Sequence, residues 1–188
     1  MEGHFLAENQ MIQGTGKNVL DYWKWAYSTV LNNRERGIFS EFLVGSALDV
    51  LNKPRVEWDN ADLQYHNYNL EVKSSAFIQS WEQSKISTPA FDIAPKYAWT
   101  GIGNEYEQEK RRFADYYIFC LLHEKNREKI NPLSMDQWEF YILPTGVLDQ
   151  LKKTQKKISL RPLQRLCSAV AYHEIKPSLD QLIEFLER

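Results

Sequence analysis

The sequence has few of the features that define several common classes of protein. Its 188 residues include only two cysteines, and its four histidines are scattered without the spacing of metal ligands, which argues against a disulfide framework and against a zinc site. No apolar run approaches the roughly 20 residues that a membrane helix needs. The first residues lack the basic head and apolar stretch of a signal peptide. We therefore expect a soluble, cytoplasmic protein without a membrane partner.

Glycine and net charge are also scarce. The segment GTGK (residues 14–17) lacks the spacing and the preceding strand of a phosphate-binding loop. The 23 basic and 25 acidic residues give a net charge of −2. This value neither indicates nor excludes a nucleic-acid partner, because an enzyme with an acidic metal site can keep a separate basic surface. Hydrophobic residues make up 43% of the chain, which is enough for a folded core.

The order of the predicted elements indicates the α/β class. Five segments have the helical spacing of apolar residues: 19–33, 37–52, 145–153, 160–168 and 178–188. Five others have the alternation or the apolar runs of strands: 61–66, 69–77, 89–95, 112–122 and 137–143. Ser178 and Gln181 have capping-box spacing, so the last helix is expected to begin at Ser178. We expect a central mixed five-stranded sheet flanked by helices.

The chain is expected to form a single domain with three parts. Residues 1–18 are polar and would form a loosely held arm. Residues 19–143 would form the core, and residues 144–188 a C-terminal helical part.

The segment YNLEVKSSAF (residues 68–77) carries an acid and a base on one face of a predicted strand. Alternation puts Glu71 and Lys73 on that face, roughly 6.5–7 Å apart. At that separation a carboxylate can bind a metal ion while an ammonium reaches a water beside it. If the preceding strand pairs through a tight turn, Asp62 lies near Glu71, and the two carboxylates converge as Mg²⁺ ligands do.

Glu41 is a third acid at an unusual position. It lies on the apolar stripe of the second helix, beside Val44 and Leu48, where a carboxylate is costly unless it is paired or bound to a cation. The alternative is a buried ion pair of Glu41 with Arg55 or Lys73. For Glu71 and Lys73 the alternative is a surface ion pair of little energetic value.

A helix acid, then an Asp, then Glu-x-Lys on adjacent strands resembles the PD-(D/E)xK nuclease superfamily. The pieces here are Glu41, Asp62 and the run Glu71-Val72-Lys73. The stretch LEVKSSAFIQSW also resembles small, uncharacterised bacterial members of that superfamily. The resemblance covers roughly residues 35–80 and implies a restriction-endonuclease-like core, which the strands up to residue 143 fit.

The sequence departs from the superfamily pattern at one point. No Pro-Asp pair precedes the strand, and EWDNADLQ offers Asp59 and Asp62 instead. Asp62 is favoured because Leu63 and Tyr65 follow it in strand-like alternation. Asp59 is the alternative.

The resemblance implies an endodeoxyribonuclease that depends on Mg²⁺ or Mn²⁺ and hydrolyses phosphodiester bonds of DNA. Asp62 and Glu71 would hold the ion, with the Val72 carbonyl as a further ligand and Glu41 bound directly or through water. Lys73 would orient the attacking water or neutralise the charge that develops on phosphorus. Three polar side chains just after the motif would contact phosphate or a bound water: Ser74, Ser75 and Gln79.

The sequence also suggests a further substrate contact, an oligomeric state and two alternative functions. Trp81 could stack on a base, although most tryptophans are core residues. A homodimer is expected because two strands need two cuts. The alternative functions are a non-catalytic DNA- or protein-binding module that retains the nuclease fold, and a phosphoesterase acting on small nucleotides.

Overall fold

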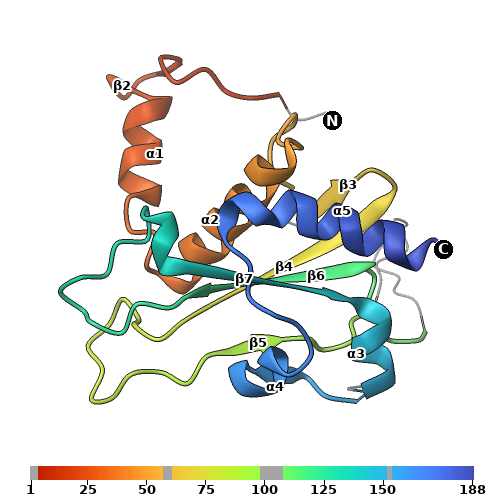
Figure 1. Ribbon diagram of the computed structural model, residues 1–188. Coiled ribbons are helices and arrows are strands. Elements are labelled where there is room, and N and C mark those ends of the chain that lie inside the picture. Colours follow the sequence, from red (N-terminus) through yellow and green to blue (C-terminus); the bar gives the residue numbers. More distant parts are fainter. Residues whose placement is uncertain (1–3, 57–60, 98–107, 152–153) are drawn as a thin grey trace.

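A mixed four-stranded sheet forms the centre of the molecule. The computed structural model describes residues 4–56, 61–97, 108–151 and 154–188. In this part of the chain the main sheet has the order β3-β4-β6-β7 (Figure 1), with β3 Leu63–Tyr65, β4 Tyr68–Ala76, β6 Tyr116–Leu122 and β7 Trp138–Pro144. β4 and β6 are parallel, and the other two pairs are antiparallel. The α/β class and the mixed sheet are thereby confirmed.

The prediction of five strands in this sheet was wrong for residues 89–95. The strand there, β5 (Ala90–Asp92), pairs with β8 (Lys157–Ser159) in a separate two-stranded sheet. Phe91 and Ile158 are each 1% exposed, because this small sheet packs against a face of the central sheet instead of extending its edge. β8 also interrupts the part of the chain that was expected to be wholly helical.

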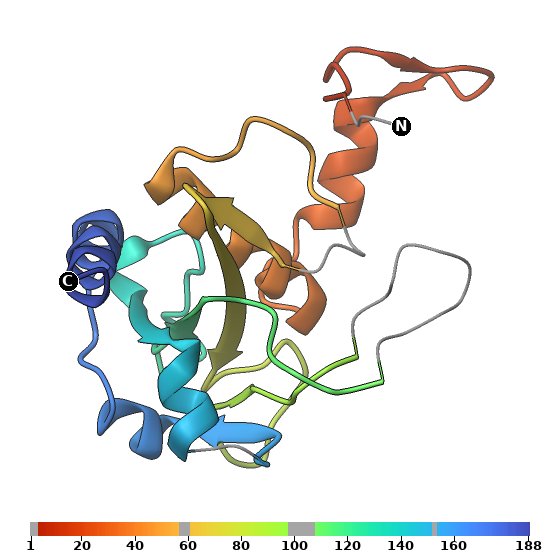
Figure 2. The same ribbon diagram turned by 90° about the vertical axis from the view of Figure 1, so that its right-hand side faces the viewer.

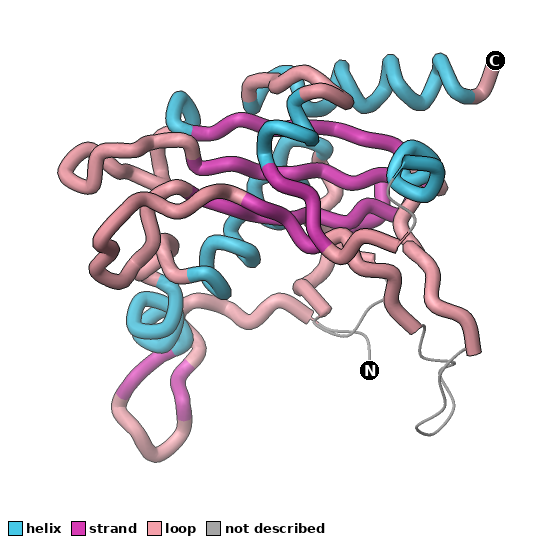
Figure 3. Tube along the Cα trace, turned by 90° about the horizontal axis from the view of Figure 1, so that it is seen from below, coloured by secondary structure: helices cyan, strands magenta, loops and turns pink. Residues whose placement is uncertain are grey.

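Two apolar cores cover the two faces of the central sheet. On one face lie α2 (Asn33–Leu48) and α5 (Ile175–Leu186), which pack against Leu70, Val72 and Ile118. On the other face lie β5, β8, α3 (Thr145–Leu151) and α4 (Leu160–Gln164), as Figures 1 and 3 show. β6 is buried along its whole length, as its nearly continuous apolar sequence predicts.

The N-terminal segment projects away from the sheet (Figure 2). Its strands β1 (Met11–Ile12) and β2 (Lys17–Asn18) form a small hairpin, and α1 (Val19–Tyr27) follows. Asn18 and Asp21 form a capping box that fixes the start of α1. The bounds of the first two helices differ from those expected from the sequence, 19–33 and 37–52. In the structure α1 ends at Tyr27 and α2 begins at Asn33. No helix in the described ranges is long and apolar enough to cross a membrane.

The hairpin of β3 and β4 is closed by a tight turn, as predicted. Tyr65 pairs with Tyr68, so His66 and Asn67 form a two-residue loop. The positive φ belongs to His66, at 51°. Gly45 of α2 lies against the segment that leads to this hairpin, since a Cβ there would meet the Leu51 side chain at 2.4 Å. A Cβ at Gly45 would also meet Leu63 Cδ2 of β3 at 3.3 Å, so α2 and β3 lie close together at this position.

The last helix begins one turn earlier than its capping signal indicates. α5 starts at Ile175, and its N-cap residue Glu174 makes no side-chain capping bond. Ile175 is fully buried, so burial of its side chain extends the helix beyond Ser178. Pro177 falls in the first turn, where a missing N–H costs nothing. Two short 3-10 helices complete the fold: Met135–Gln137 and Tyr172–Glu174.

Candidate active site

Asp62 lies at the edge of β4, just before β3 begins. Its backbone N–H donates to the Leu70 carbonyl at 3.1 Å, and its Oδ2 accepts the Val72 N–H at 2.7 Å. The Asp62 side chain therefore accepts a backbone hydrogen bond from the edge of β4 at a position beyond the end of β3. In an extended strand the N–H and C=O of one residue point to the same side. The Val72 carbonyl accordingly faces the edge that Asp62 occupies.

Glu71 and Lys73 lie together on the β4 face that carries β5. Lys73 Nζ is 2.5 Å from Glu71 Oε1 and 3.9 Å from Asp62 Oδ2. The amine thus stands between the two carboxylates. Glu71 is 5% exposed, so this is not the solvated surface pair of the alternative reading. The structure brings Asp62, Glu71 and Lys73 together as the sequence predicts.

A second amine, which the sequence did not indicate, also reaches Glu71. Lys96 Nζ lies 2.7 Å from Glu71 Oε1, and its side chain is 57% exposed. Lys96 follows β5 and bridges in the backbone to Arg111, which precedes β6. Because this placement depends on how β5 packs against the sheet, no local pattern marks Lys96.

The two carboxylates have opposite pKa shifts. Burial raises the pKa of Asp62 to about 6, the charge of Glu71 adds to the rise, and Lys73 opposes it. Burial also disfavours ionised Glu71, but Lys73 and Lys96 outweigh it and hold the pKa of Glu71 below its usual value. Burial therefore destabilises ionised Asp62, and a cation beside it would relieve this cost.

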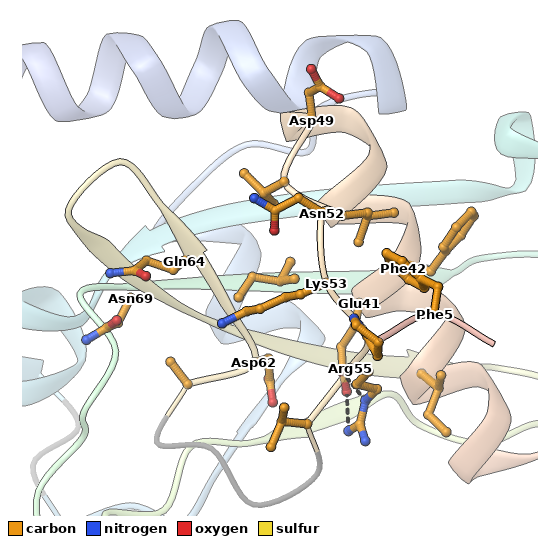
Figure 4. Close-up of a pocket in the computed structure, with 17 residues that line it drawn as sticks. Phe5, Glu41, Phe42, Asp49, Asn52, Lys53, Arg55, Asp62, Gln64 and Asn69 are labelled. Atoms are coloured by element: carbon orange, nitrogen blue, oxygen red, sulfur yellow. Dashed lines mark hydrogen bonds and ion pairs between the residues drawn. The ribbon is translucent and has the colours of Figure 1, made fainter. Parts of the chain in front are cut away.

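Glu41 approaches from the other face of β4 and is held by Arg55. Its Oε1 accepts from an Arg55 terminal nitrogen at 2.9 Å, which is the ion pair that the alternative reading proposed. Figure 4 shows the pair at the wall of a cavity of about 720 Å³ that Asp62 also lines. Glu41 contributes to the raised pKa of Asp62, although burial, Glu71 and Lys73 have larger effects.

Three acids do not meet at one point in the described structure. Within those ranges no group of three or more His, Cys, Asp or Glu side chains is close enough to hold a metal ion. Asp62 and Glu71 form the close pair, and Glu41 stands apart with Arg55. Asp59, the alternative to Asp62, lies outside the described residues.

The three polar side chains after the motif lie at the end of β4, beside Arg36 of α2. Arg36 donates to Ser74 Oγ at 3.2 Å and to Gln79 Oε1 at 3.4 Å. Ser75 and Gln79 are buried, at 8% and 7% exposed. Together with Trp81 they line a second cavity, of about 340 Å³. Like Lys96, Arg36 carries no local sequence pattern that distinguishes it from a surface residue.

A similarity that covers most of the chain agrees with a nuclease site. A family model described as bacteriophage T4 endonuclease IV matches residues 7–161. The chain belongs to this family. The match spans most of the endonuclease IV-like chain and includes Glu41, Asp62, Glu71 and Lys73, and it supports a nuclease-like function. Comparisons with curated proteins and with solved structures gave no match. The PD-(D/E)xK assignment stays a prediction.

Proposed function

We propose that the chain is an endonuclease that hydrolyses phosphodiester bonds of DNA with the help of Mg²⁺ or Mn²⁺. The proposed site is of the PD-(D/E)xK type, built from Asp62, Glu71 and Lys73. The observation that carries the proposal is the position of the Lys73 amine between two partly buried carboxylates, 2.5 Å from one and 3.9 Å from the other. The family match supports the endonuclease class.

The donor set fits a magnesium ion that shares its coordination with substrate. Mg²⁺ commonly uses one or two carboxylates and completes its octahedron with waters and phosphate oxygens. Asp62 Oδ1 and Glu71 Oε2 accept no hydrogen bond from the described residues. The Val72 carbonyl faces the same edge of β4. Two carboxylates and a carbonyl would hold the ion, and it would supply Lewis acidity and a water of lowered pKa.

The amines have separate roles in this proposal. Lys73 would place its positive charge beside the scissile phosphate, where negative charge grows as the nucleophile attacks. Lys96 would hold Glu71 in position and balance its charge when no metal is bound. Glu41 stays a candidate ligand, and its part would depend on releasing Arg55.

The direct test is cleavage by the purified chain and by two variants. Supercoiled plasmid, single-stranded DNA and RNA are incubated with Mg²⁺, Mn²⁺ or a chelator. We expect cutting of DNA with either metal and none with chelator. Lys73→Ala and Asp62→Asn should each lower the rate at least 100-fold, a loss of about 3 kcal/mol in transition-state stabilisation.

Matched controls exclude a contaminating nuclease and general damage to the fold. Lys24 of α1 and Glu184 of α5 are exposed and belong to neither cavity, so Lys24→Ala and Glu184→Gln should cut at the wild-type rate. Equal cutting by the Lys73 variant and the wild type would refute the proposal. DNA binding without any cutting would instead support the non-catalytic module.

A further inference from the structure

The cavity at the end of β4 contains a buried positive charge that no acid among the described residues neutralises. Arg36 is 4% exposed, and its guanidinium donates to neutral acceptors: Ser74 Oγ, Gln79 Oε1, Asn33 Oδ1 and the Leu31 carbonyl. Burial lowers the pKa of Arg36 to about 10, so the group stays charged at neutral pH. A buried charge is costly unless it is paired, and no described carboxylate provides that pairing.

The walls of this cavity suit an anion. Neutral hydrogen-bonding side chains and one indole line it, without any acid: Asn33, Ser74, Ser75, Gln79, Ser87, Thr88 and Trp81. Asn33 and Arg36 belong to the first turn of α2, whose N-cap Asn32 makes no side-chain capping bond. The positive end of the helix therefore adds to the charge of Arg36.

Hydrogen bonds hold the backbone of the loop that carries Trp81, and the residue itself is half exposed. Its indole is on the wall of the cavity with 53% of the residue exposed. Arg127 donates to the carbonyls of Gln79 and Trp81 at 2.9 and 2.5 Å. Gln83 links the two ends of this loop, because its Oε1 accepts from the Gln79 N–H at 2.7 Å and its Nε2 donates to Ser87 Oγ at 3.0 Å. A loop whose backbone is held in this way loses little conformational entropy when a ligand stacks on the indole that it carries.

The cavity borders the strand that carries the proposed catalytic lysine. Ser74 points to the α2 face and contacts Arg36, whereas Ser75 points to the same face of β4 as Lys73 and lies about 6.5–7 Å further along the strand. That is a distance at which one nucleotide of a chain can occupy the cavity while its neighbour lies at Lys73.

We propose that this cavity binds the nucleotide next to the scissile phosphate, with its phosphate facing Arg36 and its sugar and base against Trp81. The ligand class is a nucleic-acid backbone, and the inference rests on the proposed nuclease function for its place in catalysis. Phosphate supplies the anion that Arg36 lacks, and Arg is well suited to phosphate because its N–H groups form a planar fork.

Binding in the presence of chelator tests the inference without any cleavage. The probes are fluorescein-labelled DNA, as single strand and as duplex, and RNA of equal length, followed by fluorescence anisotropy. Trp81→Ala should raise the Kd about 5-fold or more for the probe that binds best. Thr88→Glu, which places a negative charge at the exposed rim, should raise it about 10-fold, whereas Ser84→Glu in the same loop should leave it unchanged.

Arg36→Lys and Arg36→Met complete the series, with the melting temperature measured because Arg36 is buried. Wild-type affinity in both Trp81→Ala and Thr88→Glu would overturn the inference, even if Lys73→Ala still abolishes cutting. If the wild type cuts nothing but these variants lose affinity, the cavity stands as a nucleic-acid site and the hydrolase proposal fails. Equal loss in Thr88→Glu and Ser84→Glu would also overturn it, because the effect would then be general repulsion.

Discussion

At the residue scale, Asp62 is a carboxylic acid whose ionisation is costly. Its pKa is raised to about 6 by burial and by Glu71, whereas an unfolded chain would titrate near 3.9. The folded chain therefore binds the extra proton between about pH 4 and pH 6. Stability from this group is present below about pH 4 and is lost as the pH rises through 6.

The expected consequence is a pH-dependent gain in the variant Asp62→Asn. With chelator present, the variant should become more stable than the wild type as the pH rises from 4 to 7, by up to roughly 3 kcal/mol. Urea unfolding of both proteins across this range measures the difference. A difference that does not change with pH would contradict the assigned shift.

Lys96 provides a second prediction at this scale. Its amine lies 2.7 Å from Glu71 Oε1 and repels any cation that approaches the same carboxylate. Lys96→Ala should bind Mn²⁺ about 5-fold more tightly by calorimetry, a modest effect because the amine is half exposed. Lys24→Ala is the control. Weaker Mn²⁺ binding by the Lys96 variant would show that the amine does not compete with the metal.

The close group in this site could be predicted because it is local in sequence. Alternation and one hairpin place Asp62, Glu71 and Lys73, and the pairing of Glu41 with Arg55 was among the weighed alternatives. Lys96 and Arg36 could not be found in this way. Each reaches β4 from an element whose packing depends on the whole sheet, and a lone Lys or Arg has no local signature.

At the element scale, tertiary packing decides where the strands and helices end. The alternation of residues 69–77 and the apolar run of 112–122 gave β4 and β6, since burial on the sheet reinforces each pattern. β5 has the sequence of a strand but lies outside the main sheet, because Phe91 packs on the opposite core and β8 supplies its partner. Sequence periodicity predicts a strand but does not indicate which other strand it pairs with.

The start of α5 gives a prediction that separates capping from burial. Ser178 lies inside the helix, so Ser178→Ala should change the free energy of unfolding by less than about 0.5 kcal/mol, whereas loss of a true N-cap costs about 1 kcal/mol. Ile175→Ala should cost about 2–4 kcal/mol, because Ile175 is fully buried. Urea unfolding checks both values. A larger loss in the serine variant would place the cap where the sequence predicted it.

At the scale of the whole molecule, the proposed site and the adjacent cavity follow one strand. Lys73 leads directly into Ser74 and Ser75, and α2 supplies Glu41 near one part of β4 and Arg36 near its end. The sheet therefore aligns the proposed metal-binding pair with the cavity that we propose for phosphate. Such an arrangement would follow a nucleic-acid backbone over two neighbouring nucleotides.

The expected homodimer stays a prediction at this scale. It rests on the need for two cuts in a duplex. Sedimentation equilibrium at micromolar concentration should give twice the mass of the chain without DNA, and that mass plus the mass of the duplex when DNA is bound. One chain per particle under both conditions would contradict the prediction and would favour one cut per binding event.

The central claim is that Asp62 and Glu71 hold one divalent cation beside Lys73. Crystals soaked in Mn²⁺ and measured near the manganese absorption edge test it most directly. The account predicts an anomalous peak within about 2.5 Å of a carboxylate oxygen of each acid, and no such peak in Asp62→Asn crystals. Strong peaks elsewhere with none at this pair, in crystals that diffract well, would contradict the account.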